Sequence, residues 1–162
     1  MSFRTHLAVS IALAVIAGSS TAATRTIYAQ ANGAGACQGA LPNYEGQIRK
    51  RPLAIQNEGS AGAFITCSPV SLQGNELHGT GHELILINNA DATTTVNCTG
   101  VSGASYMPKS VQVPGNGQAS LSWLEADGVE GTNLDTMNMS CLIPPGIGIR
   151  TIYTRQVVDV GQ

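Results

Sequence analysis

Apolar and polar residues alternate in short segments over most of this 162-residue chain. In the segment TTTVNCTG, Thr93–Gly100, Val96 and Cys98 share one side, because successive side chains of a β-strand point to opposite faces. In TMNMSCLI, Met139 and Cys141 share one side in the same way. No segment after residue 30 keeps an apolar period of about 3.6 residues next to a helix cap. The pattern therefore predicts an all-β fold: an antiparallel, immunoglobulin-like β-sandwich of about six to eight strands.

Turn residues divide these segments. LAIQN and AFITCS flank the turn Glu58–Gly62, so we expect them to form a hairpin. KSVQV and QASLSWL flank Pro114–Gly117, whose Asn-Gly pair tolerates positive φ and predicts a second hairpin. The stretches Ser68–His82 and Val101–Pro108 are expected to be mainly loop. Leu84–Ile87 is apolar throughout and predicts a buried strand, and IGIRTIYTRQVV predicts the last strand.

The first residues have the layout of a secretory signal peptide. Arg4 gives a basic start, Leu7–Ala17 is an apolar run, and small residues follow up to Ala23. The run of about 11 residues is too short to cross a bilayer, which takes roughly 20. We therefore expect residues 1–23 to be a signal peptide and the protein to be exported, to the periplasm or the extracellular space. We expect no transmembrane segment in the mature chain.

The remaining length suits one domain. Residues 24–36 are rich in glycine and alanine and are expected to form a loose N-terminal arm, followed by a single β-sandwich domain over residues 37–162. Charged residues make up only 11% of the chain, and once Arg4 is removed the basic residues are outnumbered by ten acidic ones. This balance argues against a nucleic-acid partner, which needs a basic face. The partner stays unknown, with a protein and a glycan as the alternatives.

The four cysteines all follow the expected signal peptide. Four cysteines in an exported chain imply two disulfides, and sequence allows three pairings. Cys98 and Cys141 occupy equivalent inward positions near the ends of two strands, so we predict a Cys98–Cys141 disulfide and, by remainder, Cys37–Cys67. A zinc site is not expected, because the chain has no C-x-x-C motif.

HGTGHE holds the candidate metal ligands His78, His82 and Glu83. Two histidines four residues apart share one face of a helix, but Gly79 and Gly81 argue against a helix here. We therefore expect a glycine-rich loop that leads into the next strand, with no metal and no cofactor.

An acidic segment follows the predicted second hairpin. It contains four carboxylates of the kind that a glycosidase with dispersed catalytic groups uses. They are Glu125, Asp127, Glu130 and Asp135. A solvated acidic loop is the preferred interpretation of these carboxylates. A nucleophile motif of the G-x-S-x-G type is also missing from the chain. We therefore expect no catalytic residues and no enzyme activity.

The segments CQGALPNYEGQIRKRPLAIQNEGSAGAFITCS, VNCTG and MSCLIPPG resemble small exported four-cysteine proteins of Gram-negative bacteria. The resemblance covers most of the mature chain and implies export and a β-rich domain, but no activity.

Three functions are consistent with these features. The first is a non-enzymatic exported sandwich that acts as a binding module or a structural component of the bacterial envelope. The second is a fimbria-like subunit that assembles by strand donation. Its penultimate tyrosine signature is missing from the end Val160–Gln162. The third is a small secreted hydrolase with dispersed carboxylates.

Overall fold

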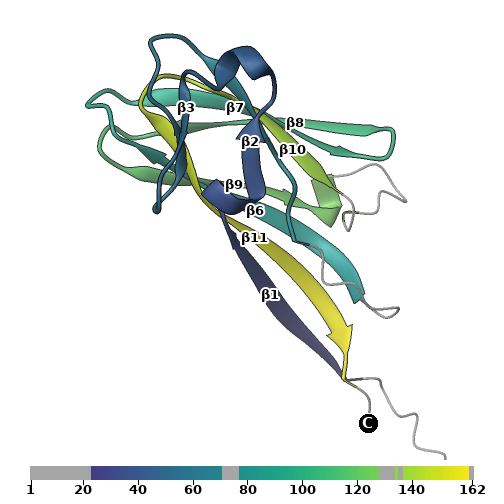
Figure 1. The fold of residues 1–162 in the computed structure, drawn as a ribbon. Coiled ribbons are helices and arrows are strands. Elements are labelled where there is room, and N and C mark those ends of the chain that lie inside the picture. The colour runs from purple at the N-terminus through teal and green to yellow at the C-terminus, as the bar shows by residue number, and fades with distance from the viewer. Residues whose placement is uncertain (1–22, 71–76, 128–133, 135–136, 161–162) are drawn as a thin grey trace, which may run out of the picture.

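The protein is a sandwich of two antiparallel sheets in a computed structural model that describes residues 23–70, 77–127, 134 and 137–160 (Figure 1). Sheet A has the strand order β3-β4-β11-β6-β9, and β1 also pairs with β11. Sheet B has the order β2-β5-β10-β7-β8. The strands of sheet A are β1 (Thr24–Asn32), β3 (Ile48–Lys50), β4 (Ile55–Asn57), β6 (Leu77–Asn88), β9 (Gln118–Leu124) and β11 (Ile147–Asp159). The strands of sheet B are β2 (Cys37–Gly39), β5 (Ala63–Cys67), β7 (Thr94–Ser102), β8 (Ser105–Val113) and β10 (Asn138–Ile143).

Short helical turns connect some of these strands. They are the helix α1 (Gly33–Ala36) and the 3₁₀ turns η1 (Pro42–Tyr44) and η2 (Glu125–Asp127). None of the helices in the described part of the chain is long and apolar enough to cross a membrane.

The order of the strands is that of a jelly roll. From β4 to β11 the chain passes from one sheet to the other at every connection except the one between β7 and β8. Such winding of eight strands across two sheets defines the jelly roll, whereas immunoglobulin domains place A-B-E-D in one sheet and C-F-G in the other. The antiparallel sandwich is thus confirmed, and its strand order is the jelly roll instead of the immunoglobulin order.

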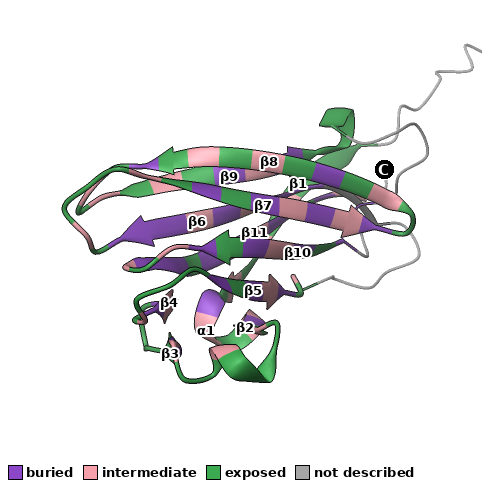
Figure 2. Ribbon diagram, turned by 90° about the horizontal axis from the view of Figure 1, so that it is seen from above, coloured by how far each residue is buried: buried purple, intermediate pink, exposed green. Residues whose placement is uncertain are grey.

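The core lies between the two sheets and follows from the alternation along each strand. Figure 2 shows buried positions alternating with more exposed ones along β7, while β8 alternates mainly between intermediate and exposed positions. Val96, Cys98, Met139 and Cys141 are buried, as their shared sides predict. Trp123 of β9 is fully buried, and its Nε1 donates a hydrogen bond to the Met107 carbonyl oxygen of β8 at 2.8 Å. This bond satisfies the indole N–H inside the core and links sheet A to sheet B.

The predicted hairpin of LAIQN with AFITCS is wrong. β4 pairs with β3 and β11, while β5 lies in the other sheet and pairs with β2 and β10. Asn57 stabilises the connection from β4 in sheet A to β5 in sheet B, because its Nδ2 donates to the carbonyl oxygens of Ala61 at 2.7 Å and Ile143 at 2.8 Å. A turn signal between two strands shows that the chain reverses, but it does not show that the strands pair.

The predicted hairpin at Asn116-Gly117 fails for the same reason. The turn itself is present: Asn116 has φ 50° and the Gly117 amide donates to the Pro114 carbonyl oxygen at 3.1 Å. However, β8 pairs with β7 in sheet B, and β9 pairs with β6 in sheet A. The turn therefore carries the chain from one sheet to the other.

Two stretches that were expected to be loop are partly strand. Val101–Pro108 contains the tight turn between β7 and β8, where Ser102 pairs with Ser105 and Gly103 has φ 57°. Glycine adopts this left-handed conformation readily because it has no Cβ. β6 begins at Leu77, so the second half of Ser68–His82 belongs to a strand that pairs with β11.

Thr24–Asn32 forms a strand instead of a loose arm. All nine residues of β1 pair antiparallel with β11, from Thr24 opposite Asp159 to Asn32 opposite Thr151. None of them is buried, and Figure 1 shows β1 lying along β11, which pairs with β6 on its other side. The hydrogen-bonded ladder to β11, rather than core packing, therefore orders this segment.

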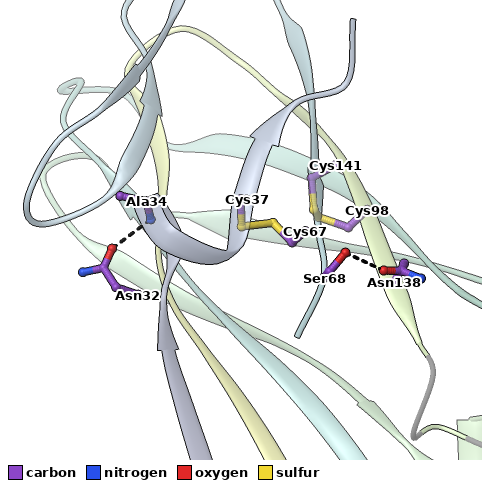
Figure 3. The surroundings of a disulfide bond; sticks show 8 residues. All are labelled: Asn32, Ala34, Cys37, Cys67, Ser68, Cys98, Asn138 and Cys141. Atoms are coloured by element: carbon purple, nitrogen blue, oxygen red, sulfur yellow. Dashed lines mark hydrogen bonds between the residues drawn. A yellow bond between two sulfur atoms is a disulfide. The ribbon is translucent and has the colours of Figure 1, made fainter. Parts of the chain in front are cut away.

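The two disulfides have the predicted pairing (Figure 3). Cys37 of β2 lies directly opposite Cys67 of β5, and Cys98 of β7 lies opposite Cys141 of β10. All four cysteines are buried. Both bonds therefore join neighbouring strands of sheet B.

Candidate functional site

The structure describes the side chains of two HGTGHE candidates, His82 and Glu83, and it does not bring these two together. His82 is 2% exposed, and its ring bonds to the Leu134 carbonyl oxygen through Nε2 at 2.6 Å and to Thr154 Oγ1 through Nδ1 at 3.1 Å. Glu83 follows it in β6 and points to the opposite face of the sheet. Within the described residues no three His, Cys, Asp or Glu side chains could hold a metal together. The side chain of His78 lies outside the described residues.

His82 is a structural residue. The Leu134 carbonyl can only accept, so Nε2 carries a proton, while Nδ1 lies within hydrogen-bond distance of the Thr154 hydroxyl. The ring thereby ties Leu134, which lies within the acidic segment, to β6 and β11. Both ring nitrogens have partners inside the protein, as a buried imidazole requires.

The acidic segment supplies no catalytic pair in the described part of the chain. Asp127 accepts a hydrogen bond from Lys109 Nζ at 2.6 Å and another from the Leu124 amide at 2.7 Å. The Lys109 hydrogen bond is the main reason why the pKa of Asp127 is lowered, so this carboxyl stays ionised and is a poor general acid. Glu125 is exposed in the same turn, while Glu130 and Asp135 lie outside the described residues.

The outer face of sheet A carries the candidate site. The strand register places Gln30 of β1, Tyr153 of β11, Glu83 of β6 and Ser122 of β9 side by side in one row across the sheet. The row above it contains Asn32, Thr151, Ile85 and Ser120, and the row below it contains Tyr28, Arg155, Gly81 and Leu124. Polar and aromatic side chains from four strands therefore share one face.

The larger of two hollows on this face has a volume of about 420 Å³. Its lining is mostly polar and consists of Gln30, Asn32, Leu53, Ile85, Gln118, Arg150, Thr151 and Tyr153. The volume falls in the range of pockets that bind small ligands.

A β-bulge places Arg150 at this hollow. Ile149 pairs with Leu86 and Thr151 with Ile85, so Arg150 is the extra residue of β11. At the same point the other neighbour of β11 changes from β4, which ends its pairing at Ile149, to β1, which begins at Thr151. The bulge leaves Arg150 unpaired in both ladders and turns its side chain to the exposed face, which is a common use of bulges at binding sites.

Asn32 fixes one wall of the larger hollow. Its Nδ2 donates to the Pro52 carbonyl oxygen at 3.1 Å, and its Oδ1 accepts from the Ala34 amide at 2.8 Å. The first bond joins the end of β1 to the segment that carries Leu53, another lining residue. The wall is thus held by one local hydrogen bond and by one between residues that are 20 positions apart in sequence.

The smaller hollow, of about 150 Å³, lies on the other side of Tyr153. Its lining consists of Tyr28, Gly81, His82, Glu83, Ser122, Leu124, Tyr153 and Arg155. A Cβ at Gly81 would lie 2.8 Å from the Trp123 carbonyl oxygen, so a side chain here would push β9 away and close the hollow. Because Tyr153 lines both hollows, we describe them together as the groove of sheet A.

The two parts of the groove differ in charge. Arg150 is the charged residue among the described lining of the larger hollow, and its Nη1 makes a long hydrogen bond to Gln118 Oε1 at 3.4 Å. The smaller hollow contains both Glu83 and Arg155. The larger hollow is therefore positive, while the charges of the smaller one balance.

Sequence reasoning missed this groove for two reasons. It treated the segment that holds Tyr28 and Gln30 as a loose arm, so these residues had no place on a sheet. It also identified IGIRTIYTRQVV as a strand without asking what its outward side chains face. The alternation of Thr151, Tyr153 and Arg155 in that strand was the available signal.

No family model and no curated protein matches the chain. Solved structures of similar fold include the C-terminal family 6 carbohydrate-binding module of LamC, a marine laminarinase from Zobellia galactanivorans. Its TM-score is 0.48 and its identity 10%, with 82% of this chain and 99% of that chain covered. The family 11 carbohydrate-binding module from Clostridium thermocellum has a TM-score of 0.37 and 6% identity, with 86% of this chain and 96% of that chain covered.

A third similar structure is an exo-β-1,3-galactanase from Phanerochaete chrysosporium, with a TM-score of 0.45 and 13% identity over 79% of this chain. This chain spans only 29% of the length of that enzyme. All three similarities concern the fold, and they assign no ligand to this chain.

Proposed function

We propose that this protein is an exported, non-enzymatic binding module that holds an oligosaccharide in the groove of sheet A. The observation that carries the proposal is the meeting, at Tyr153, of a larger polar hollow and a smaller hollow that is mostly apolar. A sugar chain has apolar C–H faces, which pack against an aromatic ring, and many hydroxyls, which need donors and acceptors along the whole ligand. A groove with a polar hollow, a mostly apolar hollow and a tyrosine between them offers both.

Amide and hydroxyl side chains supply the polar contacts. Gln30, Gln118 and Ser122 come from three different strands of sheet A and line the groove. An amide both donates and accepts, so it can bind a hydroxyl in either role. These side chains are mounted on paired strands, which hold them in place better than loops would.

The same groove favours binding over hydrolysis. Glu83 is the one carboxylate among the described residues that line it. A glycosidase of the usual kind needs two carboxyl groups on either side of the scissile bond. The hydrolase alternative is therefore less well supported than the binding module.

The strand-donation alternative is also less well supported. A fimbria-like subunit leaves one strand position empty for its neighbour. In this chain the edge of β11 from Thr151 to Asp159 is already occupied by β1 of the same chain.

Two disulfides support export, because such bonds persist in oxidising compartments.

The test is a binding measurement on the purified mature protein. Soluble oligosaccharides and polysaccharides, both neutral and acidic, are titrated by calorimetry, and retarded migration in gels that contain each polysaccharide is measured in parallel. The parent protein is expected to bind at least one of them. Tyr153→Ala is expected to weaken that binding about tenfold or more, because it removes the aromatic surface at the centre of the groove.

Tyr106→Ala is the matched control. Tyr106 is 73% exposed on β8 of sheet B, far from the groove in the sandwich, so its removal should leave binding unchanged. Equal losses in the two variants, or no binding of any saccharide by the parent, would contradict the proposal. Release of reducing ends that disappears in Glu83→Gln would instead favour the hydrolase.

A further inference from the structure

The larger hollow holds a positive charge that no acidic side chain of its described lining neutralises. Ion pairs between described residues include Arg51 with Glu58 and Lys109 with Asp127. Arg150 belongs to neither, and no acidic residue is among the described lining of its hollow. Its hydrogen bond to Gln118 at 3.4 Å uses one of the five N–H donors of a guanidinium.

The surroundings of Arg150 suit a planar anion. A guanidinium binds a carboxylate through two parallel hydrogen bonds, and this geometry favours arginine over lysine at such sites. Gln118 lies beside Arg150, and Gln30 lines the same hollow from β1. Their amide groups can donate to the remaining lone pairs of the anion and to neighbouring hydroxyls.

The other half of the groove is different. Glu83 and Arg155 both line the smaller hollow, so an anion there would meet one attractive and one repulsive charge. Along β11, Arg150 and Arg155 are separated by roughly 16 Å at the usual rise per residue. The groove is thus long enough for several linked units, and its charge differs from one end to the other.

We infer that the groove selects an acidic glycan, whose uronate carboxylate is paired with Arg150 in the larger hollow while neutral units extend past Tyr153. This inference rests on the proposed function and names the chemical class of its ligand. The pairing is an exposed one, so its contribution falls as salt is added.

The experiment compares two forms of one backbone. The parent protein is titrated with oligomers of polygalacturonate and with the same oligomers after full methyl esterification, which removes the charge and keeps the sugar. Alginate oligomers serve as a second acidic probe. The parent is expected to bind at least one acidic probe about tenfold more tightly than the esterified oligomers at low salt, as a charged hydrogen-bonded pair allows.

Arg150→Gln is the decisive variant. It should lower affinity for the acidic probe to the level of the esterified one and leave affinity for the esterified oligomers unchanged. Arg150→Lys should keep part of the preference, because it retains the charge without the bidentate geometry. Arg25→Gln, at an exposed position of β1 outside the groove, removes the same charge from the chain and should change neither affinity. Thermal melts and circular dichroism of each variant report whether it is folded.

Two outcomes separate the inference from the proposed function. Equal affinity for acidic and esterified oligomers, lost in Tyr153→Ala but not in Arg150→Gln, overturns the inference and leaves the binding module intact. Binding of neither form, together with no effect of Tyr153→Ala on any saccharide, overturns both. An equal decrease in Arg150→Gln and Arg25→Gln shows a general charge effect and also overturns the inference.

Discussion

The two sheets of this sandwich are built differently. Sheet B contains both disulfides, and its described strand pairs run without a register shift from β2 to β8. Sheet A contains neither disulfide, and the pairing of β11 with β6 shifts register twice, between Ile149 and Thr151 and between Arg155 and Gln156. The groove lies on sheet A, beside these irregularities. A regular, crosslinked sheet thus supports a second sheet whose local irregularity shapes the site.

Two hydrogen bonds connect the sheets to each other. Trp123 of sheet A is hydrogen-bonded to Met107 of sheet B, and Lys109 Nζ of sheet B donates to the Ser122 carbonyl oxygen of sheet A at 2.8 Å. Both links end on β9, which forms one side of the groove. Sheet B therefore helps to hold in place the strand that carries Ser122.

The largest expected effect is the loss of a disulfide from sheet B. Replacing both Cys98 and Cys141 by alanine opens a link across 43 residues of sequence. The free energy of unfolding should fall by about 4 kcal/mol on the chain-entropy account, as measured by urea denaturation. If sheet A forms the site by itself, saccharide binding at a temperature well below the melting point should survive. A decrease of less than about 1 kcal/mol in the free energy of unfolding would show that the disulfide does not restrain the unfolded chain as described.

A smaller effect is expected from the buried polar contact of sheet A. His82→Leu leaves the Leu134 carbonyl and the Thr154 hydroxyl without their partner, so the free energy of unfolding should fall by about 2 kcal/mol. The double variant His82→Leu/Thr154→Val removes one of the orphaned groups and should be more stable than His82→Leu alone. Thr154→Val by itself is the control. A double variant that is less stable than the single variant His82→Leu would refute the assigned hydrogen bonds.

The smallest effect concerns an exposed pair near the edge of sheet A. Hydrogen bonds from Arg51 and then from Gln56 lower the pKa of Glu58 from its ordinary value of 4.5 to about 2. Because the folded pKa is depressed, the contribution of the pair is complete above pH 4.5 and is lost as pH falls from there to about 2. Carboxyl-carbon NMR should give a Glu58 midpoint of about 2, and Arg51→Gln should raise it. A midpoint near 4.5 in the parent protein would show that the pair does not form in solution.

The sequence predicted correctly which side of a strand is buried, because burial follows the alternation of residues along that strand. It did not predict which strands pair, because pairing depends on segments that are distant in sequence. The inward positions of Cys98 and Cys141 follow from their own strands, and their common depth near the strand ends gave the correct disulfides. No local signal tells which sheet a strand joins. The Asn116-Gly117 turn has the conformation that its residues favour, and yet it links two sheets instead of closing a hairpin.

The groove was harder still to predict. It requires that Gln30, Tyr153 and Ser122 come from three strands that are separated by long stretches of chain. The bulge at Arg150 arises because two ladders of β11 meet there, which is a property of tertiary structure and not of the residues around it. The metal and acid candidates, by contrast, are clusters of neighbouring residues in the sequence. The hydrogen bonds that make His82 a buried structural residue come from Leu134 and Thr154, which lie far along the chain.

The pairing of β1 with β11 brings the two ends of the described chain together. The Val160 amide donates to the Ala23 carbonyl oxygen at 2.9 Å, where β1 begins and β11 ends in Figure 1. A short linker could therefore join residue 160 to residue 24, and new ends could be opened at Gly103–Ala104, where a tight exposed turn connects β7 and β8. Such a circularly permuted chain would keep every strand of both sheets and would make β1 an internal segment.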